Sequence, residues 1–356
     1  MSIELIISLV KANIVLAVLL TNTILLIWFE RKVVAGMQSR VGPDRAGPFG
    51  ILQTLADAIK LLLKEQILPS KADRAMYLLA PLIALVPSFL IFMIIPLGPD
   101  ITVEWQNSLY TIPLVGADLN VGVLYFLALS SIAVYSVVLA GWSSGSKYPL
   151  LGGVRASAQM ISYEAAMGLA LVPVILYSGS LSLVDIVNSQ SGNLSSSIPI
   201  LNTIVSFIPK WNIFPQFVAF GIFFIAAVAE VNRAPFDLVE AEQELVGGFH
   251  TEYSGFRFAM FFLAEYINMF NMCAITATFF LGGWLGPTFE GILPPIFSVI
   301  MPIIWLGVKT FLLLFVFVWI RATLPRLRYD QLMELGWKRM IPLSLVWLIL
   351  SAIVLG

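Results

Sequence analysis

A series of long apolar runs is the feature that most constrains what this chain of 356 residues can fold into. A helix that crosses a bilayer needs about 20 mostly apolar residues, and eight runs come close to that length or exceed it. Only 12% of the residues are charged, compared with about 25% in a soluble domain. We therefore predict an all-α polytopic membrane protein that forms a single integral membrane domain over residues 1–356. The expected spans are residues 6–29, 76–97, 121–141, 157–177, 214–229, 256–283, 297–320 and 340–355.

The positively charged residues divide the predicted connections into two sets. Short loops rich in Lys and Arg remain in the cytoplasm, and seventeen of the twenty Lys and Arg residues lie in the first, third, fifth and seventh connections. We predict that these four connections face the cytoplasm and that both termini lie on the opposite side. The second connection, residues 98–120, carries acids but no cation, and we expect a hairpin or an irregular loop. The Ser-rich fourth connection is expected to be a solvated linker that can include a short surface helix before Ser189.

Residues 51–65 show an amphipathic pattern. Leu52, Leu55 and Ile59 fall on one face at helical spacing, whereas Asp57 lies on the opposite, polar face. The run is too short to span a bilayer. We predict a helix that lies on the cytoplasmic surface of the membrane; the alternative is a helix that packs flat against a soluble partner.

The chain has one cysteine, Cys273, and one histidine, His250. An iron–sulfur cluster, a Cys/His zinc site and a bis-His haem each need several such ligands. We therefore expect no metal or redox cofactor to be bound by this chain alone, so that redox chemistry would use cofactors of partner chains. Cys273 is expected to pack in an apolar helix, and His250 to be a satisfied loop histidine, with titration alongside the neighbouring acids as the alternative. The sequence has no basic tail and gives no indication of nucleic-acid binding.

Ionisable residues occur inside or at the edges of several predicted spans. Such groups are costly in a membrane unless they are paired or hydrated, so each is a candidate functional residue. They are Glu30 and Arg31 at the end of the first span, Glu164 at the start of the fourth, Glu230 at the end of the fifth, Glu265 within the sixth and Lys309 within the seventh.

Two of these buried groups leave alternatives open. Glu265 shares a partly polar helical face with Asn268. It can exchange protons as part of a proton relay, or it can make one interhelical hydrogen bond that tightens packing. Lys309 can pair with a buried carboxylate, or its long stem can place the ammonium in a water-filled gap.

Six carboxylates crowd into residues 229–253, with a single arginine among them. They are Glu230, Asp237, Glu240, Glu242, Glu244 and Glu252. Asp237 and Glu240 are spaced as in a capping box at a helix N-terminus, which accounts for two of the six acids. A hydrated funnel of carboxylates that leads protons towards Glu164 and Glu265 accounts for more of them.

Several long strings of the sequence resemble one family, the H subunit of the proton-pumping NADH-quinone oxidoreductase, respiratory complex I. They are ERKVVAGMQSRVGPDRAGP with LADAIKLLLKE, GWSSGSKYPLLGGVRASAQMISYE, RAPFDLVEAEQELVGGFHTEYSG with FFLAEY, and WIRATLPRLRYDQLMELGW. They follow the family order from Glu30 to Trp337. The resemblance implies an eight-helix subunit of the cell (inner or plasma) membrane, docked against other complex I subunits and surrounded by lipid. It also implies that the chain forms much of the tunnel for the substrate quinone, while FMN and iron–sulfur clusters belong to partner subunits.

The resemblance also assigns residues by motif position. The implied proton relay consists of Glu164, Glu230, Glu240, Glu242, Glu244 and Glu265. The implied quinone tunnel includes Glu30, Arg31, Asp57, Phe236 and Asp237. Arg31 can stabilise charge that develops on a reduced quinone, and a plain ion pair with Glu30 is the alternative.

Two positions depart from the family pattern. Asp44 stands in GPDR where the family usually has GPNR, which bears on pairing with Arg45. Ser131 stands where some relatives have a glutamate, so the relay is expected to be shorter there or bridged by water.

The sequence leaves the electron donor open. The equivalent subunit of a complex fed by reduced F420 or by a hydrogenase is the near alternative, because the donor binds a different chain. A stand-alone cation channel or antiporter is an alternative of another class, and the long cytoplasmic motifs argue against it.

Overall fold

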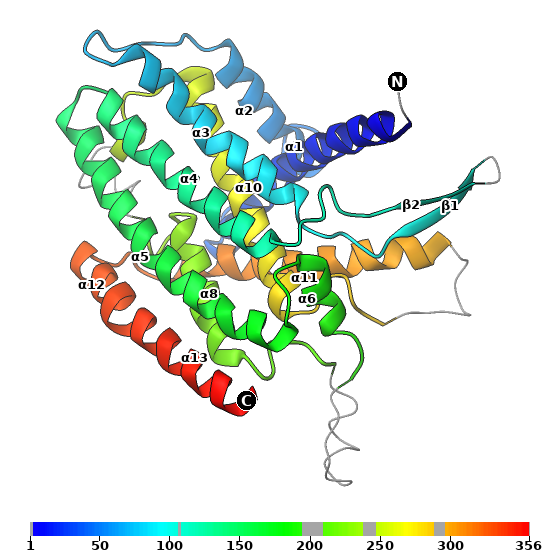
Figure 1. Cartoon of the computed structure of the whole chain (residues 1–356). Helices are drawn as coiled ribbons and strands as arrows, with labels where there is room; N and C mark the ends of the chain where they lie inside the picture. Colours follow the sequence, from blue (N-terminus) through cyan, green and yellow to red (C-terminus); the bar gives the residue numbers. More distant parts are fainter. Residues whose placement is uncertain (1–2, 106–107, 194–208, 238–246, 288–295, 356) are drawn as a thin grey trace.

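The structure is a computed structural model that describes residues 3–105, 108–193, 209–237, 247–287 and 296–355. Within these ranges the chain is a bundle of long helices (Figure 1), as predicted. The long elements are α1 (Ile3–Met37), α3 (Arg74–Met93), α4 (Gly122–Ser143), α5 (Lys147–Ser178), α8 (Phe217–Glu230), α10 (Gly255–Phe280), α11 (Ile296–Thr323) and the continuous stretch α12 (Tyr329–Glu334), η3 (Leu335–Met340) and α13 (Ile341–Leu355). The short elements are η1 (Pro48–Gly50), α2 (Leu52–Leu63), β1 (Ile101–Trp105), β2 (Ser108–Ile112), α6 (Leu183–Ser189) and η2 (Gly248–His250).

Seven helices in the described part of the chain are long and apolar enough to cross a membrane. The eighth predicted span is the shorter α8, whose 14 residues rise about 21 Å, compared with a hydrocarbon core of about 30 Å. Its core-facing residues Ala219, Phe223 and Ala226 are fully buried in the bundle. A short helix is tolerated there because protein, rather than lipid, surrounds its ends.

Two helices extend beyond their predicted bounds, and both differences move a charged residue. α1 continues to Met37, so that Glu30 lies inside a helix and not at its end. α5 begins at Lys147, which puts Glu164 in the middle of the helix and not at its start. In both cases the polar residues of the flanking connection continue the helix, because a helix satisfies its own backbone hydrogen bonds in water as well as in lipid.

The odd-numbered connections meet at one end of the bundle. The Asp73 amide donates to the Ser143 carbonyl at 2.9 Å, joining the first connection to the end of α4, and the Leu327 amide donates to the Pro235 carbonyl at 3.0 Å, joining the seventh to the fifth. At the other end, the Val123 amide donates to the Leu181 carbonyl at 3.0 Å. The helices therefore alternate in direction, as the distribution of Lys and Arg predicts; which end faces the cytoplasm remains a prediction.

The core lies where α5, α8 and α10 pack together. Its largest fully buried side chains include Tyr163, Phe223, Ile267 and Phe279. α4 and α5 approach closely at their shared connection, where a Cβ on Gly141 would lie 2.6 Å from the Pro149 carbonyl oxygen. Such close backbone contact favours tight helix packing inside a membrane.

The predicted amphipathic helix is present as α2. Its apolar residues Leu52, Leu55 and Ile59 are exposed, whereas Asp57 lies on the face that contacts α1. The chain itself therefore leaves the apolar face uncovered, in agreement with a helix that rests on lipid or on a partner.

The even-numbered connections contain two small elements. The second forms the hairpin β1–β2, in which Ile101 pairs with Ile112, and Figure 1 shows it reaching away from the bundle. The fourth contains the expected short helix, α6, but this helix buries Leu183, Ile186 and Val187 in the protein and does not lie on the surface.

Candidate functional site

A compact turn follows α8 and carries residues 231–237 back into the core. The Phe236 amide donates to the Arg233 carbonyl at 2.8 Å, Asn232 adopts a left-handed conformation with φ of 53°, and the Ala234–Pro235 bond is cis. Asn tolerates the left-handed region better than most residues do. The turn directs the Arg233 side chain inward.

Arg233 lies at the centre of a buried charge cluster. Its Nη1 is 3.1 Å from Glu30 Oε1 on α1, and its Nε is 2.6 Å from Glu265 Oε1 on α10. The guanidinium carbon lies 4.5 Å from the centre of the Tyr266 ring, a cation–π contact. Arg321 on α11 forms a second ion pair with Glu30. Only 6% of the Arg233 side chain is exposed, and a charge buried to this degree is stable only when it is well paired.

The expected alternative of an ion pair between Glu30 and Arg31 is wrong. Successive residues on a helix point about 100° apart, so Glu30 faces the core while Arg31 faces α2. Arg31 Nη1 is 2.6 Å from Asp57 Oδ2, and both side chains are partly exposed. Burial alone would raise the pKa of Asp57, but the hydrogen bonds from Arg31 and Gln53 outweigh it, and the net shift of the pKa is downward.

Phe236 and Asp237 are both buried at the end of the turn. The Phe236 ring packs against Tyr163, with ring centres 5.3 Å apart. Asp237 Oδ2 lies 3.1 Å from Arg326 Nη2 in the α11–α12 connection. The five residues assigned to the tunnel therefore occupy three neighbouring places: the Arg233 cluster, the α1–α2 contact and the end of the turn.

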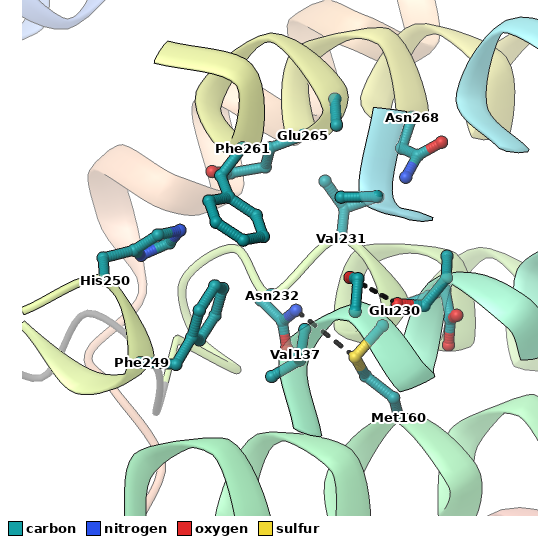
Figure 2. A pocket seen from close by; sticks show the side chains of 14 residues that line it. Val137, Met160, Glu230, Val231, Asn232, Phe249, His250, Phe261, Glu265 and Asn268 are labelled. Carbon is teal, nitrogen blue, oxygen red and sulfur yellow. Dashed lines mark hydrogen bonds between the residues drawn. The ribbon is translucent and has the colours of Figure 1, made fainter. Parts of the chain in front are cut away.

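A small polar cavity lies beside the Arg233 cluster. Its volume is about 70 Å³, enough for a few water molecules. Figure 2 shows Glu265 and Asn268 from α10, Glu230 and Asn232 around the turn, and His250 from η2 along its wall. Two polar atoms on these residues, Glu230 Oε2 and Asn268 Oδ1, are buried and have no hydrogen-bond partner within the described residues. Buried polar atoms of this kind usually bind ordered water.

Adjacent serines on α4 contact two of the predicted relay carboxylates. The Ser130 hydroxyl donates to Glu230 Oε1 at 2.9 Å, and the Ser131 hydroxyl forms a hydrogen bond with Glu164 on α5. Ser131, the position at which the sequence departs from the family, thus contacts a relay residue directly.

The structure brings some of the predicted relay residues together but not all. Glu230 and Glu265 share the cavity, and Glu164 lies outside its lining. Glu240, Glu242 and Glu244 lie outside the described residues, as does the proposed capping partner of Asp237. The other departure, Asp44, pairs with Lys32 at 3.4 Å.

His250 packs against aromatic rings. Its ring centre is 3.8 Å from that of Phe249 and 5.4 Å from that of Phe261. Burial lowers the pKa of His250 to about 3, because a low-dielectric environment disfavours the imidazolium. The side chain is accessible in part from the cavity, and as a neutral ring it forms part of the cavity wall.

Lys309 contradicts both sequence-based expectations. It pairs with no carboxylate among the described residues. Instead, its Nζ donates to the carbonyls of Leu281 at 2.6 Å and Gly283 at 2.9 Å, just beyond the end of α10, and lies 4.3 Å from the Trp211 ring centre. A cation at a helix C-terminus satisfies the last carbonyls and interacts favourably with the helix dipole. Cys273 is buried in α10, as expected for a packing residue.

Sequence reasoning missed several residues of this site. Arg321 and Arg326 entered only through the count of cations, and Tyr266 and Gln159 gave no signal. The position of Tyr266 directly after Glu265 put it within reach of whatever cation pairs with that acid, which was the one available sign.

The fold and the site define a class: a multi-pass helical membrane protein in which carboxylates from separate helices converge on a buried arginine and a small polar cavity. Sequence comparison gives the family. A profile of the NADH dehydrogenase family matches residues 10–352. The chain belongs to this family and groups with the H subunits of NADH-quinone oxidoreductases, as the sequence motifs predict.

Three curated relatives illustrate the similarity, and each is an NADH-quinone oxidoreductase H subunit that carries the number 2 in its organism. The protein from Koribacter versatilis is 47% identical over 357 residues, which cover 98% of this chain and 97% of the relative. The protein from Syntrophobacter fumaroxidans is 52% identical over 336 residues, covering 94% and 92%. That from Geobacter sulfurreducens is 50% identical over 345 residues, covering 97% and 95%.

Proposed function

We propose that this chain is the H subunit of a proton-translocating NADH-quinone oxidoreductase of the cell membrane. In this role it forms much of the quinone tunnel and transfers protons through buried carboxylates. Quinone is the substrate, while FMN and the iron–sulfur clusters belong to partner subunits. The odd-numbered connections face the cytoplasm and both termini lie on the other side. The observation that carries the proposal, beside family membership over the whole chain, is the buried Arg233 shared by Glu30 and Glu265.

The tunnel is proposed to run along Glu30, Arg31, Asp57, Phe236 and Asp237. A quinone needs apolar walls for its isoprenoid tail and a few polar groups for its head. The exposed leucines of α2 offer an apolar entrance from the membrane. Arg31 and Arg326 keep about half of their side-chain surface accessible, 46% and 48%, so that each can approach a headgroup and stabilise the negative charge that develops on reduction.

The proton path is proposed to begin near the acids Glu240, Glu242 and Glu244 and to continue through the cavity. Glu230 and Glu265 face the same cavity, where water can bridge them. Ser131 connects the path to Glu164 in the next helix.

Arg233 offers a physical link between the two processes. Its guanidinium divides its attraction between Glu30, on the tunnel side, and Glu265, in the cavity. Negative charge or proton uptake near Glu30 changes how strongly Arg233 holds the Glu265 carboxylate, since charges within about 4 Å interact strongly in a low-dielectric interior. Reduction of quinone would thereby change the proton affinity of Glu265.

A photoreactive quinone analogue tests the tunnel. After illumination of the intact complex, we expect cross-links within residues 28–60 and 233–237. Cross-links confined to the hairpin β1–β2 and α6 would refute this assignment.

Two substitutions test the relay. Glu240→Gln and Glu265→Gln are each expected to lower proton pumping per electron while the complex still assembles, because an amide cannot carry a proton onward. Wild-type pumping in both variants would refute the relay. If Glu265→Gln only lowers thermal stability, the carboxyl serves packing.

The electron donor is tested by isolating the complex in mild detergent and identifying every partner. We expect a flavin-containing NADH-oxidising module; an F420-oxidising or hydrogenase module would transfer the same tunnel to another donor. Ion flux through the purified chain alone in vesicles would instead support a channel or antiporter.

A further inference from the structure

Gln159 is a fully buried residue of α5 that neither the tunnel nor the relay includes. Its Nε2 lies 3.0 Å from the Ala229 carbonyl and 2.8 Å from the Phe236 carbonyl. A primary amide has two N–H groups, so one side chain can satisfy both acceptors. The pair of carbonyls also fixes the orientation of the amide, because only the nitrogen can donate to them.

The two acceptors lie at opposite ends of the turn that follows α8. Ala229 is in the last turn of the helix and Phe236 is seven residues further along. Carbonyls at a helix end lack partners within the helix, and a buried carbonyl without a partner is costly. Gln159 therefore draws the two ends of the turn towards one point on α5.

Neighbouring residues of α5 support the same turn. The Tyr163 ring packs against Phe236 at 5.3 Å, and the Asn232 side chain contacts Met160 Sδ at 3.6 Å, the contact drawn in Figure 2. Because Gln159, Met160 and Tyr163 lie at helical spacings of one and four residues, they occupy one side of α5. The turn thus rests on a defined face of that helix.

The turn carries the two charged residues that link tunnel and cavity. Arg233 extends from its middle to Glu30 and Glu265, and Asp237 follows Phe236 and pairs with Arg326. A movement of the turn relative to α5 would displace both groups together.

We propose that Gln159 is a positioning residue for quinone reduction and its coupling to proton transfer. Through its amide it fixes Arg233 and Asp237 relative to α5, and hence relative to each other. It touches neither quinone nor the transferred proton. This inference rests on the proposed function, because it concerns the same tunnel and cavity.

The test uses Gln159→Glu and Gln159→Met in the intact complex. The glutamate keeps the shape of the side chain but, when ionised, donates no hydrogen bond, and the methionine removes the polar group. Assembly is measured as NADH:ferricyanide reductase activity, which does not need the quinone site. The other readouts are the KM and kcat for a decyl analogue of the quinone extracted from the host membrane, and protons pumped per electron in vesicles.

We expect both variants to assemble and to raise the quinone KM by about fivefold, the factor that corresponds to the loss of one net hydrogen bond. Protons pumped per electron should fall in both, because Arg233 no longer stands at a fixed distance from Glu265. A change of stability alone would leave KM and the pumping ratio unchanged in complexes that remain assembled.

Gln190 provides a matched control within the same chain. It is equally buried, and its Nε2 donates to the carbonyls of Ile186 at 3.1 Å and Thr278 at 3.0 Å, at the opposite end of the bundle. Gln190→Glu and Gln190→Met remove the same kind of contact far from Arg233. We expect them to lower the temperature of thermal inactivation while leaving quinone KM and protons per electron at wild-type values.

Three outcomes would overturn the inference. One is wild-type KM and pumping in assembled Gln159 variants, and another is an equal effect of the Gln190 variants. The third is failure of both Gln159 variants to assemble while the Gln190 variants do, since this would make the amide a folding requirement. A wild-type complex without quinone reductase activity would refute the proposed function itself, which these outcomes leave intact.

Discussion

Replacing Arg233 tests the buried charge cluster most directly. Arg233→Met removes the cation between two buried carboxylates while keeping an unbranched apolar side chain. Glu30 retains Arg321 as a partner, but Glu265 loses its contact at 2.6 Å and Tyr266 loses its cation–π contact. Breaking a buried ion pair by removing one partner typically costs about 3–5 kcal/mol. The Glu265 side chain is 18% exposed, towards the cavity, so we expect a value near the lower limit, about 3 kcal/mol.

The assay is the rate of irreversible thermal inactivation of the purified complex at a fixed temperature. If the loss falls on the unfolding barrier, a destabilisation of about 3 kcal/mol accelerates inactivation roughly a hundredfold. Adding Glu265→Gln to Arg233→Met should recover part of the loss, because the uncompensated buried charge is then removed, and the double-mutant cycle measures this coupling.

Arg328 supplies the control for this prediction. It pairs with Asp330 at 2.6 Å, as short a contact as that between Arg233 and Glu265, but both side chains are largely exposed. Exposed ion pairs contribute little to stability, so Arg328→Met should inactivate at the wild-type rate. Equal rates for the Arg233 and Arg328 variants, or strictly additive effects of Arg233→Met and Glu265→Gln, would refute the account of a desolvated, coupled cluster.

Three further predictions follow from other contacts. Because the folded-state pKa of His250 is about 3 and its ordinary value is 6.5, the unfolded chain binds a proton first on acidification. Stability should therefore fall by up to about 1.4 kcal/mol per pH unit below 6.5, and His250→Phe should flatten the pH profile of the thermal midpoint. Lys309→Met should destabilise the protein by about 2 kcal/mol by leaving buried carbonyls without a donor, measured as a lower thermal midpoint, whereas exposed Lys338→Met should have no effect. Asp57→Asn should cost less than about 1 kcal/mol, since its pair with Arg31 is partly exposed, yet raise the quinone KM by displacing that arginine.

Each of these three predictions has a result that would contradict it. A thermal midpoint of the wild-type complex that stays constant between pH 7 and pH 5 would show that His250 is hydrated in the folded state. Equal midpoints for the Lys309 and Lys338 variants would mean that water replaces the ammonium. An unchanged KM in Asp57→Asn would remove Arg31 from the tunnel.

The membrane-spanning helices could be predicted from the sequence because a single physical requirement sets them. Each crossing must be apolar over about 20 residues, and a helix satisfies its own backbone hydrogen bonds without help from distant parts of the chain. The amphipathic helix α2 follows from local periodicity in the same way. The fifth predicted span, α8, was placed correctly but is shorter than expected, because protein contacts and not lipid surround it.

The candidate site was predictable in part. The types and positions of buried acids, together with long family motifs, identified Glu164, Glu230 and Glu265 as unusual residues. The sequence did not reveal that Glu230 and Glu265 face one cavity, or that a serine on α4 contacts each of Glu230 and Glu164.

The sequence by itself determined how many times the chain crosses the membrane, which connections share an end and which charges would need partners. Only the tertiary structure decided who the partners are. Glu30 and Arg31 are adjacent in sequence, yet one pairs with Arg233, 203 positions away, and the other with Asp57. The physical reason is that hydrophobicity and helix periodicity are local properties of the chain. The pairing of a buried charge, by contrast, depends on which helix faces it across the core.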